Sequence, residues 1–125
     1  MSILRSINLS EIETPGGNRT TALATPSRGA TEVSVIRQRQ QPGGMNPAHR
    51  HDREEIMVML SGEVALFCDD EPRGLTGGDV AIIPPAVSHR IENHGLDAAE
   101  WLLIAPAGIR FFHASGEETF PEWSR

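Results

Sequence analysis

The sequence predicts an all-β protein folded as an antiparallel sandwich or barrel. Helical periodicity is almost absent from its 125 residues, whereas 12 glycines and 9 prolines interrupt the chain at intervals of roughly 10 to 15 residues. The runs between these interruptions are short and rich in β-branched residues, as half-buried strands are. A chain of this length supports one sizeable core, so we expect a single domain over residues 1–125.

Seven runs are expected to form strands, and they lie in chain order at residues 20–24, 32–40, 55–60, 63–68, 79–83, 89–92 and 99–105. Turn-forming residues separate them at 15–18, 26–29, 42–44, 61–62, 69–72, 77–78 and 94–95. Between MVML and EVALF, Ser61-Gly62 predicts a tight hairpin, because glycine accepts the positive φ that such turns require.

The composition narrows the classes of partner. Acidic residues outnumber basic ones by 17 to 11, and the formal charge of −6 argues against nucleic acid or an anionic membrane surface. The first 13 residues lack the apolar core of a secretory signal, and no run approaches the length of a membrane span. Cys68 is the only cysteine, which excludes an internal disulfide framework. We expect a cytoplasmic protein in which Cys68 is an apolar strand residue.

Three histidines and a carboxylate suggest a metal site. His49 and His51 are two residues apart, so on a strand both side chains point to the same face. Glu55 follows at an even spacing and could rejoin that face, and His89 could approach from a neighbouring strand after Pro84-Pro85. Neutral imidazoles and one carboxylate suit Fe, Mn, Co, Ni, Cu or Zn as divalent ions. A His-x-His pair in a polar loop is more often a solvated surface feature, so the pair alone leaves both interpretations open.

Two sets of residues share a characteristic spacing. In the first, over residues 43–62, runs of five, one, three and six residues separate Gly43, His49, His51, Glu55 and Gly62. In the second, over residues 78–93, runs of five, one, two and three residues separate Gly78, Pro84, Ala86, His89 and Asn93. In these two motifs the chain resembles the cupin superfamily, as a small single-domain (monocupin) member.

The resemblance implies a double-stranded β-helix, or jelly-roll, barrel with short extended N- and C-terminal segments. It also implies that one divalent transition metal per subunit is held by four residues, His49, His51, Glu55 and His89. The chain departs from the family at Ala86, where the pattern has glycine. Alanine is tolerated there if its φ is negative. Asn93 is expected to bond local backbone rather than a ligand.

Side chains on the metal's side of the strands are expected to line a pocket. If Glu55 faces inward, so do Met57 and Met59, although filling the core is the default role of both. Strand parity leaves two alternatives for residues 33–40, with either Arg37 and Arg39 or Gln38 and Gln40 turned inward. Further candidates for the lining, with uncertain parity, are Phe67, Ile83, Ile91, Leu102 and Ile104.

The C-terminal segment, residues 106–125, holds four of the six aromatic residues and little periodicity. Its rings require burial, either over its own barrel or against a second subunit, and we expect a homodimer. His113 lies in this segment and could close the cavity.

Three functions fit the sequence. The favoured one is a metal-dependent enzyme on a small organic molecule, with dioxygenase-, isomerase- or cyclase-like chemistry. The second is a non-catalytic module that binds or senses a small ligand through the metal. In the third, the metal is purely structural. The chain has no tyrosine, which excludes any mechanism that requires a tyrosine base. The identity of the metal, the substrate and the reaction are not determined by the sequence.

Overall fold

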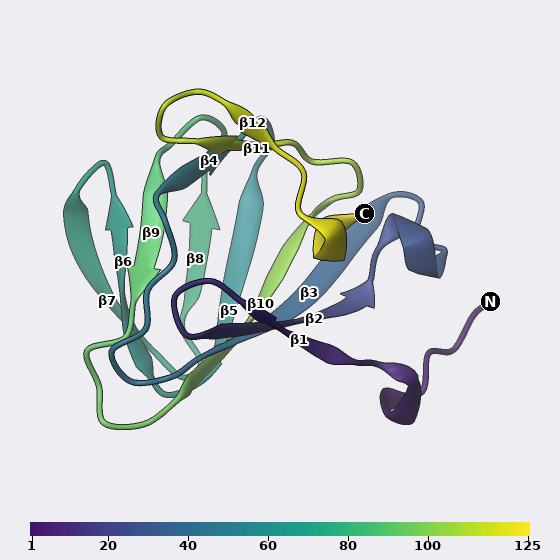
Figure 1. The fold of residues 1–125 in the computed structure, drawn as a ribbon, viewed down its shortest axis with the longest axis horizontal. Coiled ribbons are helices and arrows are strands. Elements are labelled where there is room, and N and C mark those ends of the chain that lie inside the picture. The colour runs from purple at the N-terminus through teal and green to yellow at the C-terminus, as the bar shows by residue number, and fades with distance from the viewer.

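The computed structural model describes residues 1–125 as two six-stranded antiparallel sheets (Figure 1). One sheet has the order β1-β2-β3-β10-β5-β8 and the other β12-β11-β4-β9-β6-β7. The strands are β1 (Glu11–Thr14), β2 (Asn18–Ala24), β3 (Val33–Gln40), β4 (His49–His51), β5 (Glu55–Ser61), β6 (Glu63–Cys68), β7 (Glu71–Thr76), β8 (Val80–Ile83), β9 (His89–Glu92), β10 (Ala99–Pro106), β11 (Phe111–His113) and β12 (Glu118–Thr119).

From β3 onward the chain passes repeatedly between the two sheets, as in a jelly roll. The predicted all-β barrel is therefore confirmed. The only helical elements are three short 3₁₀ turns, η1 (Ser6–Asn8), η2 (Pro26–Arg28) and η3 (Glu122–Ser124). No helix has the length and hydropathy that crossing a bilayer requires.

The predicted hairpin at Ser61-Gly62 is wrong. β5 pairs with β8 and β10, whereas β6 pairs with β7 and β9, so the turn carries the chain from one sheet to the other. Gly62 does have the expected positive φ, 77°. A Cβ there would lie 2.8 Å from the carbonyl oxygen of Ala98, so the crossing also depends on close backbone approach.

Several strands were not foreseen. Residues 69–72 were expected to be a turn, but β7 begins at Glu71 and includes Pro72 and Gly74. Because β7 is the outermost strand of its sheet, these two residues are tolerated there. The short strands β1, β4, β11 and β12 also carry too few residues for a recognisable alternation.

The core lies between the sheets, and burial settles the parity of the strands. On β3 the buried set is Ser34, Ile36, Gln38 and Gln40, so Arg37 and Arg39 face outward. On β10 alternate residues from Ala99 to Ala105 are buried, so Leu102 and Ile104 lie on the opposite face from the one expected. The hydrophobic core consists of Ile36, Met57, Met59, Val64, Leu66, Ile83, Ile91, Ala99, Trp101 and Leu103.

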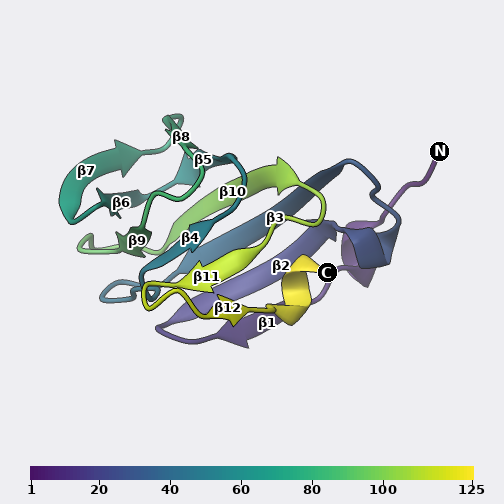
Figure 2. The ribbon, with the colours of Figure 1, turned by 90° about the horizontal axis from the view of Figure 1, so that it is seen from above.

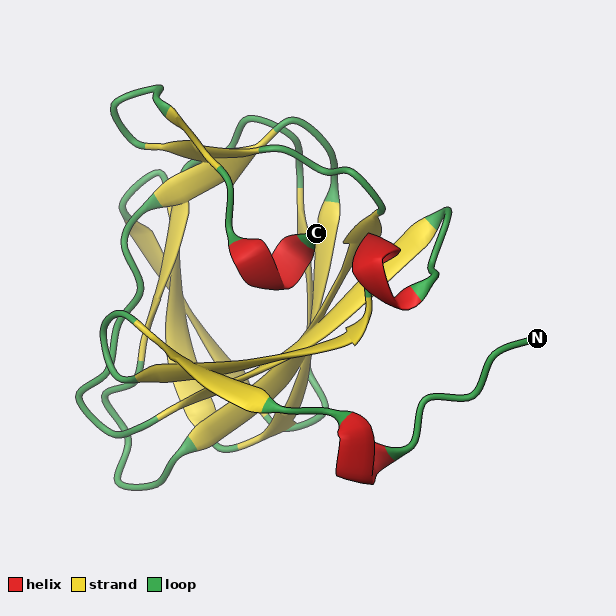
Figure 3. Ribbon diagram, turned by 45° about the vertical axis from the view of Figure 1, so that its right-hand side comes forward, coloured by secondary structure: helices red, strands yellow, loops and turns green.

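The two chain ends lie differently relative to the barrel. The C-terminal segment returns to the barrel, where β11 pairs with β4, and Figure 2 shows β11 and β12 beside β4 on the face nearest the viewer. In Figure 3, η3 lies within the ring formed by the strands. The N-terminal segment instead extends away from the barrel, with Ile3, Leu4 and Ile7 exposed.

Candidate metal centre

The three histidines come from two adjacent strands of one sheet. His49 and His51 lie on β4, and register pairs His49 with His89 of β9. Glu55 is the first residue of β5, in the opposing sheet. The four predicted side chains therefore converge from two sheets on the barrel interior.

The imidazoles form a compact cluster. One ring nitrogen from each of His49, His51 and His89 can be chosen so that all three lie within 4.8 Å of one another. The Oε1 atom of Glu55 lies 3.5 Å from Nε2 of His51 and 3.7 Å from Nε2 of His89. Two ligands held at about 2.1 Å from one ion are roughly 3.0 to 3.4 Å apart, so these separations approach those of a coordination shell.

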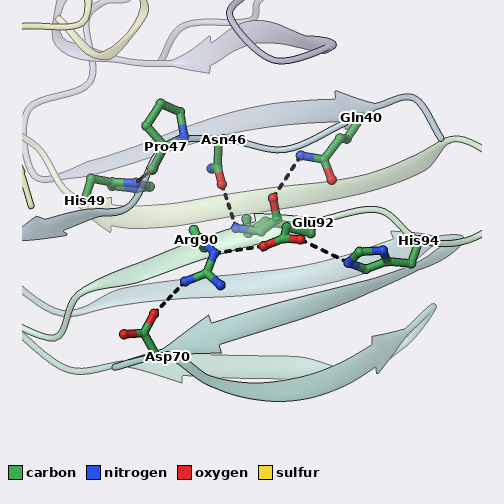
Figure 4. A network of polar contacts seen from close by, with 9 residues as sticks. Gln40, Asn46, Pro47, His49, Asp70, Arg90, Glu92 and His94 are labelled. Carbon is green, nitrogen blue, oxygen red and sulfur yellow. Dashed lines mark hydrogen bonds and ion pairs between the residues drawn. The ribbon is translucent and has the colours of Figure 1, made fainter. Parts of the chain in front are cut away.

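Backbone contacts fix the orientation of two rings. The Nδ1 atom of His49 bonds the carbonyl of Pro47 at 2.9 Å (Figure 4), and Nδ1 of His89 bonds that of Val87 at 3.0 Å. A carbonyl accepts only from a protonated nitrogen, so each ring keeps its proton on Nδ1 and presents an unprotonated Nε2.

Polar atoms without partners indicate that the cluster suits a metal. Nε2 of His89 and both ring nitrogens of His51 are buried and have no hydrogen-bond partner. Such atoms are costly unless something else binds them. Nitrogen and carboxylate donors are the set that borderline divalent metals prefer, so His49, His51, His89 and Glu55 fit such an ion.

The electrostatics favour a cation. Desolvation, reinforced by the neighbouring His89 and His51, lowers the pKa of His49 to about 4. Desolvation also lowers the pKa of His89. For Glu55, burial opposes ionisation, but the neighbouring imidazoles of His51, His89 and His49 outweigh burial, so its pKa is lowered. The lowered pKa values leave His49 and His89 uncharged beside an ionised Glu55 at neutral pH, and this negative charge favours a divalent cation.

Ala86 has a backbone conformation that the sequence did not foresee. Its φ is +66°, so the condition under which alanine is tolerated without strain, a negative φ, is not met. Its N–H donates to the carbonyl of His51 at 2.8 Å, which ties this strained turn to a candidate ligand. Asn93 behaves as expected: its side chain bonds the backbone of Gln40, Gly95 and Asp97.

A cavity of about 230 Å³ adjoins the cluster. It reaches His49 and Glu55 on one side and is otherwise lined by Thr14, Pro15, Asn18, Gln38, Asn46, Pro47, Leu103, Phe111, His113, Thr119, Pro121 and Trp123. The ring of Phe111 contacts His51 edge-to-face at 4.5 Å between centroids and Trp123 at 5.6 Å. The C-terminal segment therefore folds over its own barrel and forms a wall of the cavity.

Only two of the five predicted pocket residues line this cavity, Gln38 and His113. Met57 and Met59 are fully buried and fill the hydrophobic core instead. Phe67 lies on the outer face of β6, where the guanidinium of Arg90 sits 4.0 Å from its ring centroid, so its predicted place in the lining is wrong.

Sequence reasoning missed most of the wall. Residues of the β1–β2 turn, such as Pro15, and the loop residues Asn46 and Pro47 carried no signal beyond turn propensity. The aromatic content of residues 106–125 was a usable signal, and it leads to Phe111 and Trp123.

Comparison with known proteins agrees with this architecture. The chain is 29% identical over 76 residues to the endoribonuclease YbeY of Myxococcus xanthus, covering 60% of this chain and 26% of that protein. It is 27% identical over 99 residues to auxin-binding protein 1 of Arabidopsis thaliana, covering 72% of this chain and 50% of that protein. The chain thus spans half or less of the length of these relatives.

Among solved structures, the polyketide cyclase RemF from Streptomyces resistomycificus superposes with a TM-score of 0.79 at 19% identity, over 98% of this chain and 88% of RemF. This likeness supports the fold. The family model described as "Cupin domain" matches residues 36–105, more than half of the sequence. The chain therefore belongs to the cupin family.

Proposed function

We propose that the protein is a metal-dependent enzyme that acts on a small organic molecule bound in the cavity beside His49. One observation carries the proposal: buried ring nitrogens of His51 and His89 have no partner and lie beside the carboxylate of Glu55, which also lines the cavity. In this proposal His49, His51, Glu55 and His89 hold one divalent ion of Fe, Mn, Co, Ni, Cu or Zn. When bound, such an ion supplies Lewis-acid polarisation of a substrate oxygen, and redox chemistry where the metal permits it.

The chain's own residues would bind and orient the substrate. Gln38 and Asn46 offer amide N–H groups to substrate oxygens, and Phe111 and Trp123 keep water from the bound molecule. His113, opposite His49 in the β11–β4 register, is placed at the cavity to exchange a proton with that molecule. Cyclase- or isomerase-like chemistry requires only this orientation and proton transfer, and RemF offers a cyclase on a similar fold.

Dioxygenase-like chemistry is the redox version of the same proposal. A non-catalytic module that binds a small ligand is the alternative, and the aromatic wall of the cavity favours it equally. The name of the Arabidopsis relative, auxin-binding protein 1, provides a precedent for ligand binding.

The first test is metal analysis of protein purified without added metal. We expect about one divalent transition metal per chain. His51→Ala should abolish binding while His94→Ala, at an exposed histidine outside the cluster, should retain it. A His51→Ala protein that retains full metal content would contradict the ligand assignment.

The second test measures turnover. Oxygen uptake and product formation are followed with a panel of diketones, flavonols and phenols, using metal-loaded protein. Turnover without oxygen consumption would favour the cyclase- or isomerase-like version, and binding without turnover would favour the non-catalytic alternative.

Assembly and location are also proposed. The exposed apolar side chains of Ile3, Leu4 and Ile7 support a homodimer in which this segment packs against a second copy. A cytoplasmic location is supported by the unpaired Cys68.

A further inference from the structure

We propose that the cavity beside the three-histidine cluster takes an uncharged aromatic molecule of one or two rings bearing a carbonyl or hydroxyl oxygen, and that the side chains of its lining discriminate against anionic ligands. The inference rests on the proposed function, because it names the substrate class of the same site. Three independent features of the lining carry it.

The first feature is charge. All 11 basic residues of the chain are arginines, and none of them lines the cavity. Arg37 and Arg39, which could have reached inward, lie on the outer face of β3, where Arg37 is 3.4 Å from Glu100. Other arginines are paired outside, among them Arg90 with Asp70 and Glu92 (Figure 4) and Arg110 with Glu118.

Glu55 is the only carboxylate in the lining, and the chain carries a net charge of −6. Phosphate and carboxylate groups are normally bound by arginine forks or lysines, which supply charge-assisted hydrogen bonds. Nothing of that kind is present here. An anion entering the cavity would lose its hydration and meet no cationic side chain in return.

The second feature is the ring-rich wall. Phe111, Trp123, Pro15, Pro47 and Pro121 contribute five rings to the lining. Phe111 and Trp123 pack edge-to-face at an interplanar angle of 78°. Flat aromatic molecules gain from such surfaces both by burial and by ring geometry.

The third feature is a pair of unused donors. Gln38 accepts a hydrogen bond from Nε1 of Trp101 and donates one to Thr20, which leaves one of its two amide hydrogens. Asn46 accepts from the backbone N–H of Ile91 at 2.6 Å, and its own amide hydrogens have no acceptor among the protein's hydrogen bonds. Neutral donors of this kind suit a carbonyl or hydroxyl oxygen of the ligand.

The volume of the cavity limits the size of the ligand. At about 230 Å³ the cavity falls below the range usual for drug-sized ligands, roughly 300 to 1,000 Å³. One ring or two fused rings with a short polar substituent match this space.

Isothermal titration calorimetry with two ligands of equal shape tests the charge argument. We would titrate 1-naphthamide, which is uncharged, and 1-naphthoate, which is anionic, into the protein with its metal and again after removal of metal by EDTA. In the metal-free protein we expect 1-naphthamide to bind at least about tenfold more tightly, because only the anion then loses hydration without a cationic partner. A bound divalent ion is itself such a partner, so the preference should narrow in the metal-loaded protein. Equal affinities, or tighter binding of 1-naphthoate, in the metal-free protein would overturn the proposal.

Substitutions of Thr119 test the charge argument by adding a positive charge to the cavity lining. Thr119 lines the cavity from β12, an edge strand, so a longer side chain is accommodated at little cost to the fold. Thr119→Arg should raise the affinity for 1-naphthoate about tenfold, whereas the matched neutral variant Thr119→Gln should not. An equal rise with both variants would show that length, not charge, governs the selection and would contradict the inference.

Trp123→Leu tests the aromatic wall. It should weaken 1-naphthamide binding about tenfold, while Trp123→Phe keeps most of the affinity. Circular dichroism of each variant establishes that it is folded, and an unchanged affinity in a folded Trp123→Leu protein would contradict the role of the ring.

Different experimental results would refute the proposed function and this inference. Protein that binds no metal but selects 1-naphthamide would refute the metal-dependent enzyme and retain the ligand class. Protein that binds metal but prefers 1-naphthoate after the metal has been removed would do the reverse.

Discussion

Replacing Ala86 by glycine should stabilise the protein. Ala86 has a φ of +66°, a region in which a side chain clashes with the neighbouring carbonyl at a cost of about 1 to 2 kcal/mol. Glycine removes that cost but gives the unfolded chain more freedom, which returns about 0.5 to 1 kcal/mol. The balance is a gain of about 0.5 to 1 kcal/mol in the free energy of unfolding.

Urea unfolding of the metal-free protein, followed by circular dichroism, measures this gain. Ala81→Gly is the matched control, because Ala81 lies in β8 with strand geometry, so glycine there should destabilise by about 0.5 to 1 kcal/mol. The N–H of Ala86 that bonds His51 is a backbone group and survives the change, so metal affinity should be unaltered. A loss of stability in Ala86→Gly comparable to that of the control would refute the account of strain at this turn.

Three further outcomes follow from the structure. With its pKa lowered to about 4 from 6.5, His49 stays neutral in the folded state while the unfolded chain takes up a proton, so the metal-free protein should lose stability as pH falls through this range. The full pKa shift corresponds to about 3 kcal/mol in the free energy of unfolding, and partial exposure of His49 to the cavity reduces this contribution to roughly 2 kcal/mol. In urea titrations at several pH values, the His49→Gln variant should lack this contribution to the pH dependence. Met57→Ala should cost about 2 to 5 kcal/mol because Met57 is fully buried, whereas Met45→Ala at an exposed position should cost little, as thermal melts would show. Deleting residues 1–9 should convert the proposed dimer to a monomer in light scattering, and a dimer that persists would exclude this segment as the interface.

The ligand cluster could be predicted from the sequence in two steps. Alternation along a strand puts His49 and His51 on one face, whereas Glu55 and His89 were placed beside them only through the resemblance to the two cupin motifs. The cavity wall could not be predicted from the sequence, because it depends on which strands pair. Gln38 could be assigned inward only once the buried face of β3 was known.

The wrong predictions also arise because strand pairing and strand parity are not determined locally. The turn at Ser61-Gly62 has the local chemistry of a hairpin, but the choice between pairing in one sheet and crossing to the other is made by distant strands. Phe67 illustrates parity again: on β6 the buried positions are Val64 and Leu66, so the large ring one residue further lies outside.

Different segments of the chain supply the candidate metal ligands and the cavity wall, and this separation has a practical consequence. The candidate metal ligands all lie between residues 49 and 89, while much of the wall around the ligand space comes from the two ends, the β1–β2 turn and residues 111–123. These ends join the barrel through edge strands, since β1 and β12 are outermost in their sheets. Exchange of the terminal segments between related barrels should therefore transfer ligand preference and leave the candidate metal ligands in place. Ligand preference and metal binding could then be altered independently.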